Sequence, residues 1–222
     1  VQHNVLHHTF TNIEGMDEDI AGHTILRFSR HSPLKKIHRF QHIYAFFLYS
    51  LMTISKLVND FFQLHRYNKS GITRQQNAKP TLEYVKLIGS KLVFFFTTIG
   101  LPLLFSDFSW WQILLGFVIM LCTGGFIMAI VFQLAHVVED VAQPLPTENG
   151  NIENEWAIHQ LQTTANFSRS SRFINWFVGG LNFQIEHHLF PNICHIHYRK
   201  ISFIVEKTAR EFGLPYYIKP SF

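Results

Sequence analysis

Charged residues are scarce in this sequence of 222 residues, because aspartate, glutamate, lysine and arginine together make up only 15%. A soluble domain carries about 25% charge, so the composition argues against a wholly soluble protein. Apolar residues reach 47%, with 23 phenylalanines, which is typical of a chain in contact with lipid. The net charge of +4 suits anionic lipid headgroups. We expect no nucleic-acid partner, because no basic stripe with interleaved aromatic residues is evident.

Cysteine is also scarce, and the two that occur, Cys122 and Cys194, do not have zinc-type spacing. Cys122 lies inside the longest apolar run, so we expect no disulfide between them. The sequence also has no initiator methionine and no signal peptide. It opens at Val1, two residues before a histidine cluster, and we therefore expect an N-terminal part to precede it.

Long apolar runs are what the sequence has instead. Phe108–Val138 contains 31 residues without a charged side chain. Leu92–Ser106 is also uncharged, and Tyr84–Lys91 extends it at its front. A helix needs about 20 residues to cross a bilayer, so the two runs predict a transmembrane hairpin of Tyr84–Phe105 and Trp110–Ala135 with its turn at residues 106–109. A buried helix pair in a soluble protein is the alternative. Ile43–Ser55 is also uncharged but too short to span, and we expect an interfacial or re-entrant helix there.

Basic residues orient this hairpin. Arg74, Lys79, Lys86 and Lys91 precede or enter its first helix, whereas the turn contains only Asp107. By the positive-inside rule, both ends of the hairpin face the cytoplasm, and we expect Lys86 and Lys91 to snorkel towards headgroups. The predicted fold is therefore all-α: an integral, multi-pass membrane protein with a transmembrane hairpin and a cytoplasmic helical cap.

Polar segments make up the predicted cap. His65–Lys79 is basic and rich in asparagine and glutamine, which predicts a loop, and Glu139–Glu155 contains two prolines, which predicts a linker. Ile201–Phe212 places its apolar residues on one side. That pattern predicts an amphipathic helix that either packs on the protein or lies at the headgroups.

Two histidine clusters lie on either side of the hairpin, HNVLHH near the start and QIEHH near the end. On an α-helix His3 and His7 share a face, because residues i and i+4 are neighbours, while His8 is rotated by about 100° from His7. Such a trio can direct two ligands at one ion and the third at a neighbouring ion. The later box places its candidates at i, i+3 and i+4, and these are Gln184, His187 and His188.

Neutral imidazole is the commonest metal ligand in proteins. An even number of membrane crossings between the clusters brings both to the same side, so together they predict one metal centre. The alternative is that these are unrelated surface histidines. His136 is a further candidate, because it ends the long apolar run, where an ionisable group is costly. We expect Glu139 or Asp140 to hydrogen-bond its other nitrogen and orient the ring, and a capping histidine is the alternative.

The remaining titratable residues suggest less. For the acidic run at residues 17–19 we expect a solvated loop, with a hydrogen bond to a ligating histidine as the alternative. For His159 we favour a packing role over contact with a ligand. We expect the other histidines to be solvated or to face headgroups, and these are His23, His31, His38, His42, His65, His195 and His197.

Four stretches together resemble the membrane fatty acid desaturases. They are the HxxxHH box with Thr11 and Asn12, FQLAHVVED at Phe132–Asp140, QLQTTANF at Gln160–Phe167 and NFQIEHHLFP at Asn182–Pro191. The resemblance extends from residue 1 to about residue 197, so we expect residues 1–222 to form one partial desaturase domain. The glutamine that opens the last box is similar to that of front-end desaturases, and bacterial linoleoyl-CoA desaturase-like proteins are the most similar group.

The resemblance implies a centre of two non-haem iron ions that uses O₂ and two electrons to remove two hydrogens from an acyl chain. Imidazole suits such iron. We expect Gln184 to bind weakly or through water, and we expect no catalytic residue apart from the metal ligands. The ligands implied by the family's second and third boxes and by a further family histidine are His3, His7, His8, Gln184, His187, His188 and His136.

The resemblance also implies partners. These are a fatty acyl-CoA or acyl-lipid, an electron donor of the cytochrome b5 or ferredoxin type, and the lipid bilayer. A bacterial inner membrane is favoured, with the endoplasmic reticulum as the alternative. The family's first histidine box has no counterpart here, so we expect it upstream of Val1 and expect the 222-residue chain alone to be inactive. A di-iron lipid hydroxylase and a non-catalytic metal-binding membrane module are the alternative functions.

Overall fold

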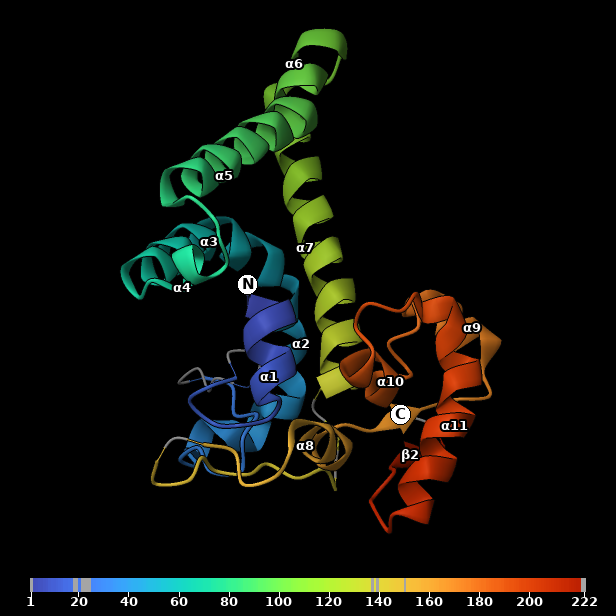
Figure 1. Cartoon of the computed structure of the whole chain (residues 1–222). Coiled ribbons are helices and arrows are strands. Elements are labelled where there is room, and N and C mark those ends of the chain that lie inside the picture. The colour runs from blue at the N-terminus through green and yellow to red at the C-terminus, as the bar shows by residue number, and fades with distance from the viewer. Residues whose placement is uncertain are drawn as a thin grey trace. The chain divides into compact units, whose positions relative to one another are not determined.

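The computed structural model describes residues 2–17, 20, 25–136, 138, 140–149 and 151–220, and this part of the chain is predominantly helical (Figure 1). It divides into two compact units. The first unit consists of Val1–Gln41 together with Val131–Phe222, and the second is His42–Ile130. Both histidine boxes belong to the first unit, whereas the turn and most of the predicted hairpin belong to the second.

Two long apolar helical runs dominate the second unit. The elements are α5 (Pro80–Phe95), the π-helical turn η3 (Phe96–Gly100), α6 (Leu101–Phe105) and α7 (Trp110–His136). The first three follow one another without a break and form one helical run. Pro102 has no N–H to donate to Thr98, and the helix widens into a π turn just before this proline. Pro80–Phe105 and Trp110–Gln133 are long and apolar enough to cross a membrane. The predicted helices and the turn between them are therefore confirmed.

The side chains of these two runs are largely exposed. None of the most apolar window of Pro80–Phe105 is buried, and only 22% of that of Trp110–Gln133 is buried. Helices in the core of a soluble protein would bury such residues. This exposure argues against the alternative of a buried helix pair, and it leaves an apolar surface that suits lipid.

The helices before the hairpin are longer than expected. α2 (Gln41–Ser50) and α3 (Met52–Lys69) meet at Leu51, so the stretch Ile43–Ser55 forms parts of two helices. The loop predicted for His65–Lys79 was wrong, because α3 continues to Lys69 and the short α4 (Ile72–Gln75) follows. Side-chain pairing one turn apart supports the end of α3, where the amide of Gln63 donates to the hydroxyl of Tyr67 at 2.9 Å.

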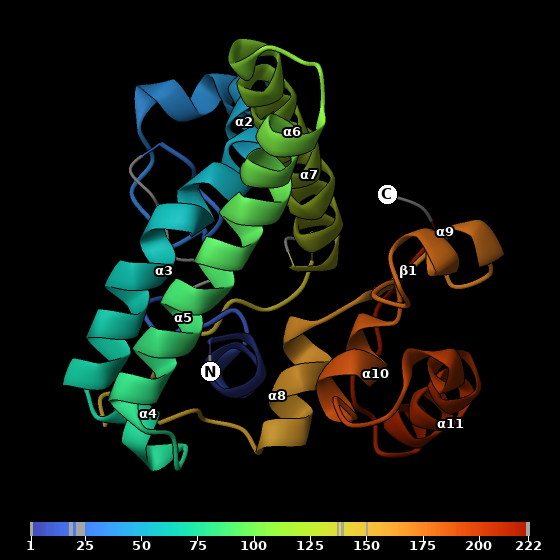
Figure 2. The ribbon, with the colours of Figure 1, turned by 90° about the horizontal axis from the view of Figure 1, so that it is seen from above.

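An ion pair links two helices of the second unit, α3 and α5, which lie side by side (Figures 1 and 2). Nζ of Lys91 lies 2.9 Å from Oδ2 of Asp60, and the Lys91 side chain is only 13% exposed. Lys91 therefore does not snorkel as predicted, because a carboxylate on the neighbouring helix is within reach. Lys86 is 61% exposed and pairs with Glu83 one turn away, at 2.8 Å.

A glycine allows α7 to pass close to the junction of α2 and α3. A Cβ atom on Gly125 would lie 2.6 Å from the carbonyl oxygen of Ser50, whereas one on Gly124 would meet nothing within 4 Å. Small residues let helix backbones approach closely, so Gly125 is the position at which this contact requires glycine.

The first unit surrounds the second histidine box with short elements. They are η1 (Gln2–His7), α1 (His8–Phe10), η2 (Lys36–Phe40), α8 (Trp156–Thr163), β1 (Asn166–Phe167), α9 (Arg172–Phe177), α10 (Gln184–Leu189), η4 (His195–His197), α11 (Tyr198–Glu211) and β2 (Ile218–Lys219). α10 lies between α8 and α11 (Figures 1 and 2), where Leu161, Ile185, Val205 and Ala209 form an apolar cluster. β1 and β2 pair in parallel, with Asn166 opposite Ile218.

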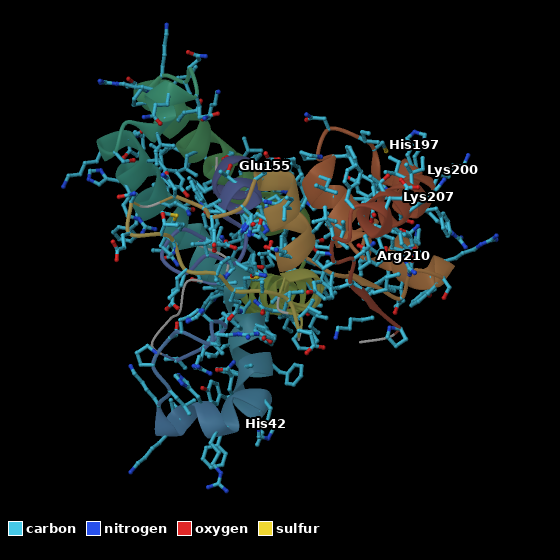
Figure 3. The ribbon with its side chains drawn as sticks, turned by 60° about the horizontal axis from the view of Figure 1, so that its bottom comes forward. His42, Glu155, His197, Lys200, Lys207 and Arg210 are labelled. Atoms are coloured by element: carbon cyan, nitrogen blue, oxygen red, sulfur yellow. The ribbon has the colours of Figure 1, made fainter. Side chains whose placement is uncertain are left out.

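α11 is the amphipathic helix predicted near the C-terminus, and it begins three residues earlier than expected. It buries Tyr198, Ser202, Val205 and Ala209 against the rest of the first unit, so its inner face packs on the protein, one of the two predicted alternatives. Its outer side carries the exposed basic residues that Figure 3 labels, namely Lys200, Lys207 and Arg210.

Candidate metal centre

The first histidine box forms a π-helix, η1, rather than the expected α-helix. Hydrogen bonds in a π-helix join residues five apart, so the ring that His3 meets most directly is that of His8. Their Nε2 atoms lie 3.4 Å apart. The rings of His3 and His7 also stack, with centroids 5.2 Å apart. The box therefore points His3 and His8 at one place, where an α-helix would have paired His3 with His7.

The second box completes this cluster. α10 places Nε2 of His187 3.4 Å from Nε2 of His3. The candidate ligand nitrogens of His3, His8 and His187 all lie within 4.8 Å of one another. Two segments from opposite ends of the chain thus converge on one point, as the sequence predicts for a shared metal centre.

The spacing and the charge state of these rings fit a metal ion. A transition metal binds imidazole nitrogen at about 2.0–2.1 Å, so the ligands of one ion lie roughly 3 to 4 Å apart. Burial, helped by the neighbouring histidines, lowers the pKa of His8 to about 3. Burial, with His3 and His7 nearby, lowers the pKa of His187 to about 4. Both rings are therefore neutral at pH 7 and retain a lone pair for a metal.

His7 is oriented by a buried carboxylate. Its Nδ1 lies 3.0 Å from each oxygen of Asp17, and Asp17 is fully buried and also accepts from the backbone N–H of Asn12 at 2.8 Å. The solvated position expected for Asp17 was wrong, because the chain turns after α1 and folds this side chain back towards the box. The alternative, a hydrogen bond to a histidine of the box, is confirmed. A carboxylate that accepts from Nδ1 leaves Nε2 as the nitrogen available to a metal.

His188 is oriented in the same way by an amide. Its Nδ1 lies 2.9 Å from Oε1 of Gln160, and the other end of that amide donates to the carbonyl of His8 at 3.1 Å. Because an amide oxygen only accepts, Nδ1 of His188 carries the proton and Nε2 keeps its lone pair. The amide nitrogen of Gln184 lies 3.0 Å from that Nε2. Gln184 is thus next to His188 at the cluster, where we expected a weak ligand.

One acidic residue lies within the second box. Glu186 is fully buried and accepts from Asn166 at 2.8 Å and from the hydroxyl of Tyr216 at 2.7 Å. Burial raises the pKa of Glu186, and the hydrogen bonds from Tyr216 and Asn166 oppose the rise. Burial, together with the charge of Glu186, also raises the pKa of Tyr216, so its hydroxyl stays a donor.

Of the other candidate residues, His136, Glu139 and Asp140, the structure describes the side chain of Asp140 alone. His136 is the last residue of α7, but its side chain and all of Glu139 lie outside the described residues. Asp140 is exposed and pairs with Lys219 of β2, with Oδ2 and Nζ 2.5 Å apart. The hydrogen bond lowers the pKa of Asp140. Its predicted role towards His136 stays a prediction.

Several other histidines take the places expected for them. His159 is buried, and its Nε2 donates to the carbonyl of Thr11 at 2.9 Å, which is a packing role beside the first box. His195 and His197 are exposed, and Figure 3 labels His197 beside Lys200. Cys122 and Cys194 are free thiols.

Sequence reasoning offered Asp17 only as an alternative and did not assign the other residues that orient the ligands. Gln160 and Asn166 belong to the stretch QLQTTANF, which we noted only for its resemblance. Tyr216 was not noted, because it lies far from both boxes in the sequence, and no local pattern connects it to Glu186.

The comparisons with known proteins agree with this geometry. The family described as fatty acid desaturase matches residues 1–220. A sn-1 linoleoyl-lipid 6-desaturase of Synechocystis is 40% identical over the whole of this chain, which covers 61% of that protein. An acyl-lipid (8-3)-desaturase of Physcomitrium patens is 39% identical, with 46% covered. A sn-1 linoleoyl-lipid 6-desaturase of Arthrospira platensis is 36% identical, with 59% covered.

No solved structure matches the chain. The chain spans about half to three fifths of the length of the curated relatives it matches. The family match, however, covers nearly every residue, and it includes both histidine boxes and the stretches that orient them. The chain therefore belongs to the fatty acid desaturase family.

Proposed function

We propose that this chain is the metal-binding and membrane-hairpin part of a fatty acyl desaturase. The whole protein would insert a double bond into an acyl chain, using O₂, two electrons from an external donor and two non-haem iron ions. The observation that carries the proposal is the convergence of His3, His8 and His187, whose candidate ligand nitrogens lie within 4.8 Å of one another. A family match over residues 1–220 supports the reaction type.

The candidate ligands form two groups, one for each iron ion. His3, His8 and His187 would hold one, while His7 and His188 would serve the other, with Gln184 beside them and His136 as a further candidate. Bound iron would supply the oxidising power by which O₂ takes two hydrogens from an unactivated –CH₂–CH₂– unit. With two electrons and two protons, the products are –CH=CH– and two water molecules.

The protein's own part in this chemistry is to orient the metal ligands and to exclude water from them. Asp17 and Gln160 fix the tautomers of His7 and His188, so that each presents Nε2. His7, His8 and His188 are at most 5% exposed, which keeps bulk water from the ligand nitrogens. Burial also lowers the pKa of His8 and of His187, which keeps these two imidazoles neutral and ready to bind metal.

The membrane placement is also part of the proposal. The hairpin would cross the bilayer twice and turn at residues 106–109, and both its ends would face the cytoplasm by the positive-inside rule. Both boxes would then lie on the cytoplasmic side, where a donor of the cytochrome b5 or ferredoxin type supplies electrons. A bacterial inner membrane is the placement we favour.

The substrate we propose is a polyunsaturated acyl chain carried by a membrane lipid, with front-end regioselectivity. Relatives from Synechocystis and Arthrospira platensis are described as acting on linoleoyl-lipid, and one from Physcomitrium patens as acting on acyl-lipid. We therefore favour a lipid-linked substrate over an acyl-CoA.

The test uses the full-length protein that contains this chain, expressed in a host supplied with uniformly ¹³C-labelled linoleate. Mass spectrometry of total lipids should show a product two mass units lighter than the substrate. His8→Ala and His187→Ala should abolish it, whereas His195→Ala, which changes an exposed histidine, should not.

Other outcomes would redirect the assignment. A product that gains one oxygen atom would identify a lipid hydroxylase. Bound metal without any turnover of acyl-CoA or acyl-lipid by the reduced, iron-replete protein would favour a non-catalytic metal-binding module. Unchanged product from both His8→Ala and His187→Ala would contradict the proposed metal centre.

A further inference from the structure

The short helix α10 carries three of the seven candidate ligands, yet little within it sets its orientation. It contains six residues, about a turn and a half, and three of them are Gln184, His187 and His188. A helix this short is not stable by itself, and its first N–H groups have no partner inside the helix. The direction of the two imidazoles therefore depends on what holds α10 from outside.

Asn166 of β1 holds the first turn of α10. Its Oδ1 accepts from the backbone N–H of Ile185 at 3.0 Å, and its Nδ2 donates to Oε2 of Glu186 at 2.8 Å. One fully buried amide thus binds both the backbone and a side chain of the helix. Rotation of α10 would break both hydrogen bonds.

Tyr216 holds the other oxygen of the same carboxylate. Its hydroxyl donates to Oε1 of Glu186 at 2.7 Å and lies 2.8 Å from Nδ2 of Asn166. Tyr216 comes from the C-terminal segment, which follows α11 and returns to pair β2 with β1. Its side chain also packs on the apolar cluster that includes Ile185. The last residues of the chain therefore reach the helix that bears the second box.

The order of residues in α10 makes this contact directional. Glu186 immediately precedes His187 and His188, and successive side chains on a helix are rotated by about 100°. When Glu186 is fixed towards Tyr216 and Asn166, the two histidines must face other directions, and in the structure they face the first box. His187 reaches His3, and the ring of His188 stacks on that of His8 with centroids 4.4 Å apart.

We propose that Tyr216 is a positioning residue of the metal centre, which acts through Glu186 and together with Asn166 to hold α10 in the metal-binding orientation. This inference rests on the proposed metal centre but adds a residue outside both histidine boxes. It gives the C-terminal strand β2 a function, which is to bring Tyr216 to α10. Loss of the hydroxyl should loosen α10 and weaken metal binding without unfolding the first unit.

The test measures metal binding rather than desaturation. The full-length protein is purified in detergent without iron and titrated with Co²⁺, whose visible absorption reports the ligand geometry. Tyr216→Phe removes only the hydroxyl, and we expect Co²⁺ affinity to fall by about 10- to 100-fold, as is typical when a group that orients a metal ligand is lost. We also expect the absorption band to change shape or intensity.

Two control variants separate positioning from stability. Tyr217→Phe removes the hydroxyl of the adjacent tyrosine, which makes no hydrogen bond to Glu186 in the described part of the chain. This variant should keep its affinity within about twofold of the wild type. Val205→Ala weakens the same apolar cluster without touching Glu186 and should lower the melting temperature with little change in affinity. If Tyr216→Phe does not fold, Glu186→Gln replaces it, because a neutral amide offers an acceptor to only one of the two donors.

The outcomes are distinguishable. If the wild-type protein does not bind Co²⁺, the proposed metal centre is wrong, and this inference is wrong with it. If the wild type binds and Tyr216→Phe binds equally well, only the role of Tyr216 is refuted. If Val205→Ala weakens Co²⁺ binding as much as Tyr216→Phe does, the tyrosine contributes stability alone and the inference is overturned.

Discussion

Replacing Asp17 by asparagine should weaken metal binding at His7 while leaving the fold of the first unit intact. The two carboxylate oxygens each lie 3.0 Å from Nδ1 of His7, and one of them also accepts from the backbone N–H of Asn12 at 2.8 Å. Asparagine has the same shape but only one acceptor oxygen. In either orientation of the amide, an NH₂ group takes the place of one of the two oxygens that lie 3.0 Å from Nδ1 of His7. The substitution also removes the negative charge that makes His7 a stronger ligand.

The expected loss of affinity follows from the position of this carboxylate. Asp17 is fully buried, so water cannot replace the lost acceptor. Loss of a group that orients a ligating histidine reduces metal affinity by about 10- to 100-fold. Converted at about 1.4 kcal/mol for each factor of ten, that is a loss of about 1.4 to 2.7 kcal/mol in binding free energy.

The assay is an anaerobic Fe²⁺ titration of the full-length protein in competition with a coloured chelator. Asp107→Asn is the control, because Asp107 is exposed in the turn between α6 and α7 and has no predicted role at the metal centre. We expect this control to retain wild-type affinity. If Asp17→Asn binds Fe²⁺ as tightly as the wild type, or if both variants weaken binding equally, Asp17 does not act through His7.

Two further predictions concern stability. Gly125→Ala should lower the free energy of unfolding by about 1–3 kcal/mol, because its Cβ would lie 2.6 Å from the Ser50 carbonyl oxygen, whereas Gly124→Ala meets nothing within 4 Å and should not destabilise. Equal melting temperatures for the two variants would contradict the close approach. Glu206→Gln should lower the melting temperature more at pH 7 than at pH 3, since the hydrogen bond from Arg169 holds the pKa of Glu206 below its ordinary value of 4.5. That stabilisation is fully present above pH 4.5 and is lost as the pH falls from there through the lowered pKa, so an effect equal at both pH values would refute it.

The membrane-like part of the fold was the most predictable from sequence. The run of 31 uncharged residues and the polar turn at 106–109 predicted both long helices and the break between them. Composition alone determines such a signal, because a long apolar helix requires no knowledge of its neighbours. Lys91 shows the limit of that reasoning. Its partner Asp60 lies 31 residues earlier, and its contact depends on how α3 and α5 pack.

The gathering of the candidate ligands was predicted, but their pairing was not. Residue spacing and resemblance identified His3, His8 and His187, and the structure brings them together. The expected α-helix would have aligned His3 with His7. A π-helix joins residues five apart instead of four. The choice depends on tertiary contacts such as the one between His7 and Asp17, which no local pattern contains.

The interior of the first unit explains why its fold and its metal site are not separable. The apolar cluster around Ile185 has four buried members, Leu161, Ile185, Val205 and Ala209. Most of the largest fully buried side chains in the described residues are polar, namely His7, His159, His188, Gln160, Gln184, Glu186, Asn12 and Asn166. A buried polar network stabilises a fold only when its members are satisfied. The hydrogen bonds that orient the ligands are therefore also those that hold this unit together, and metal binding would add to its stability through the same residues.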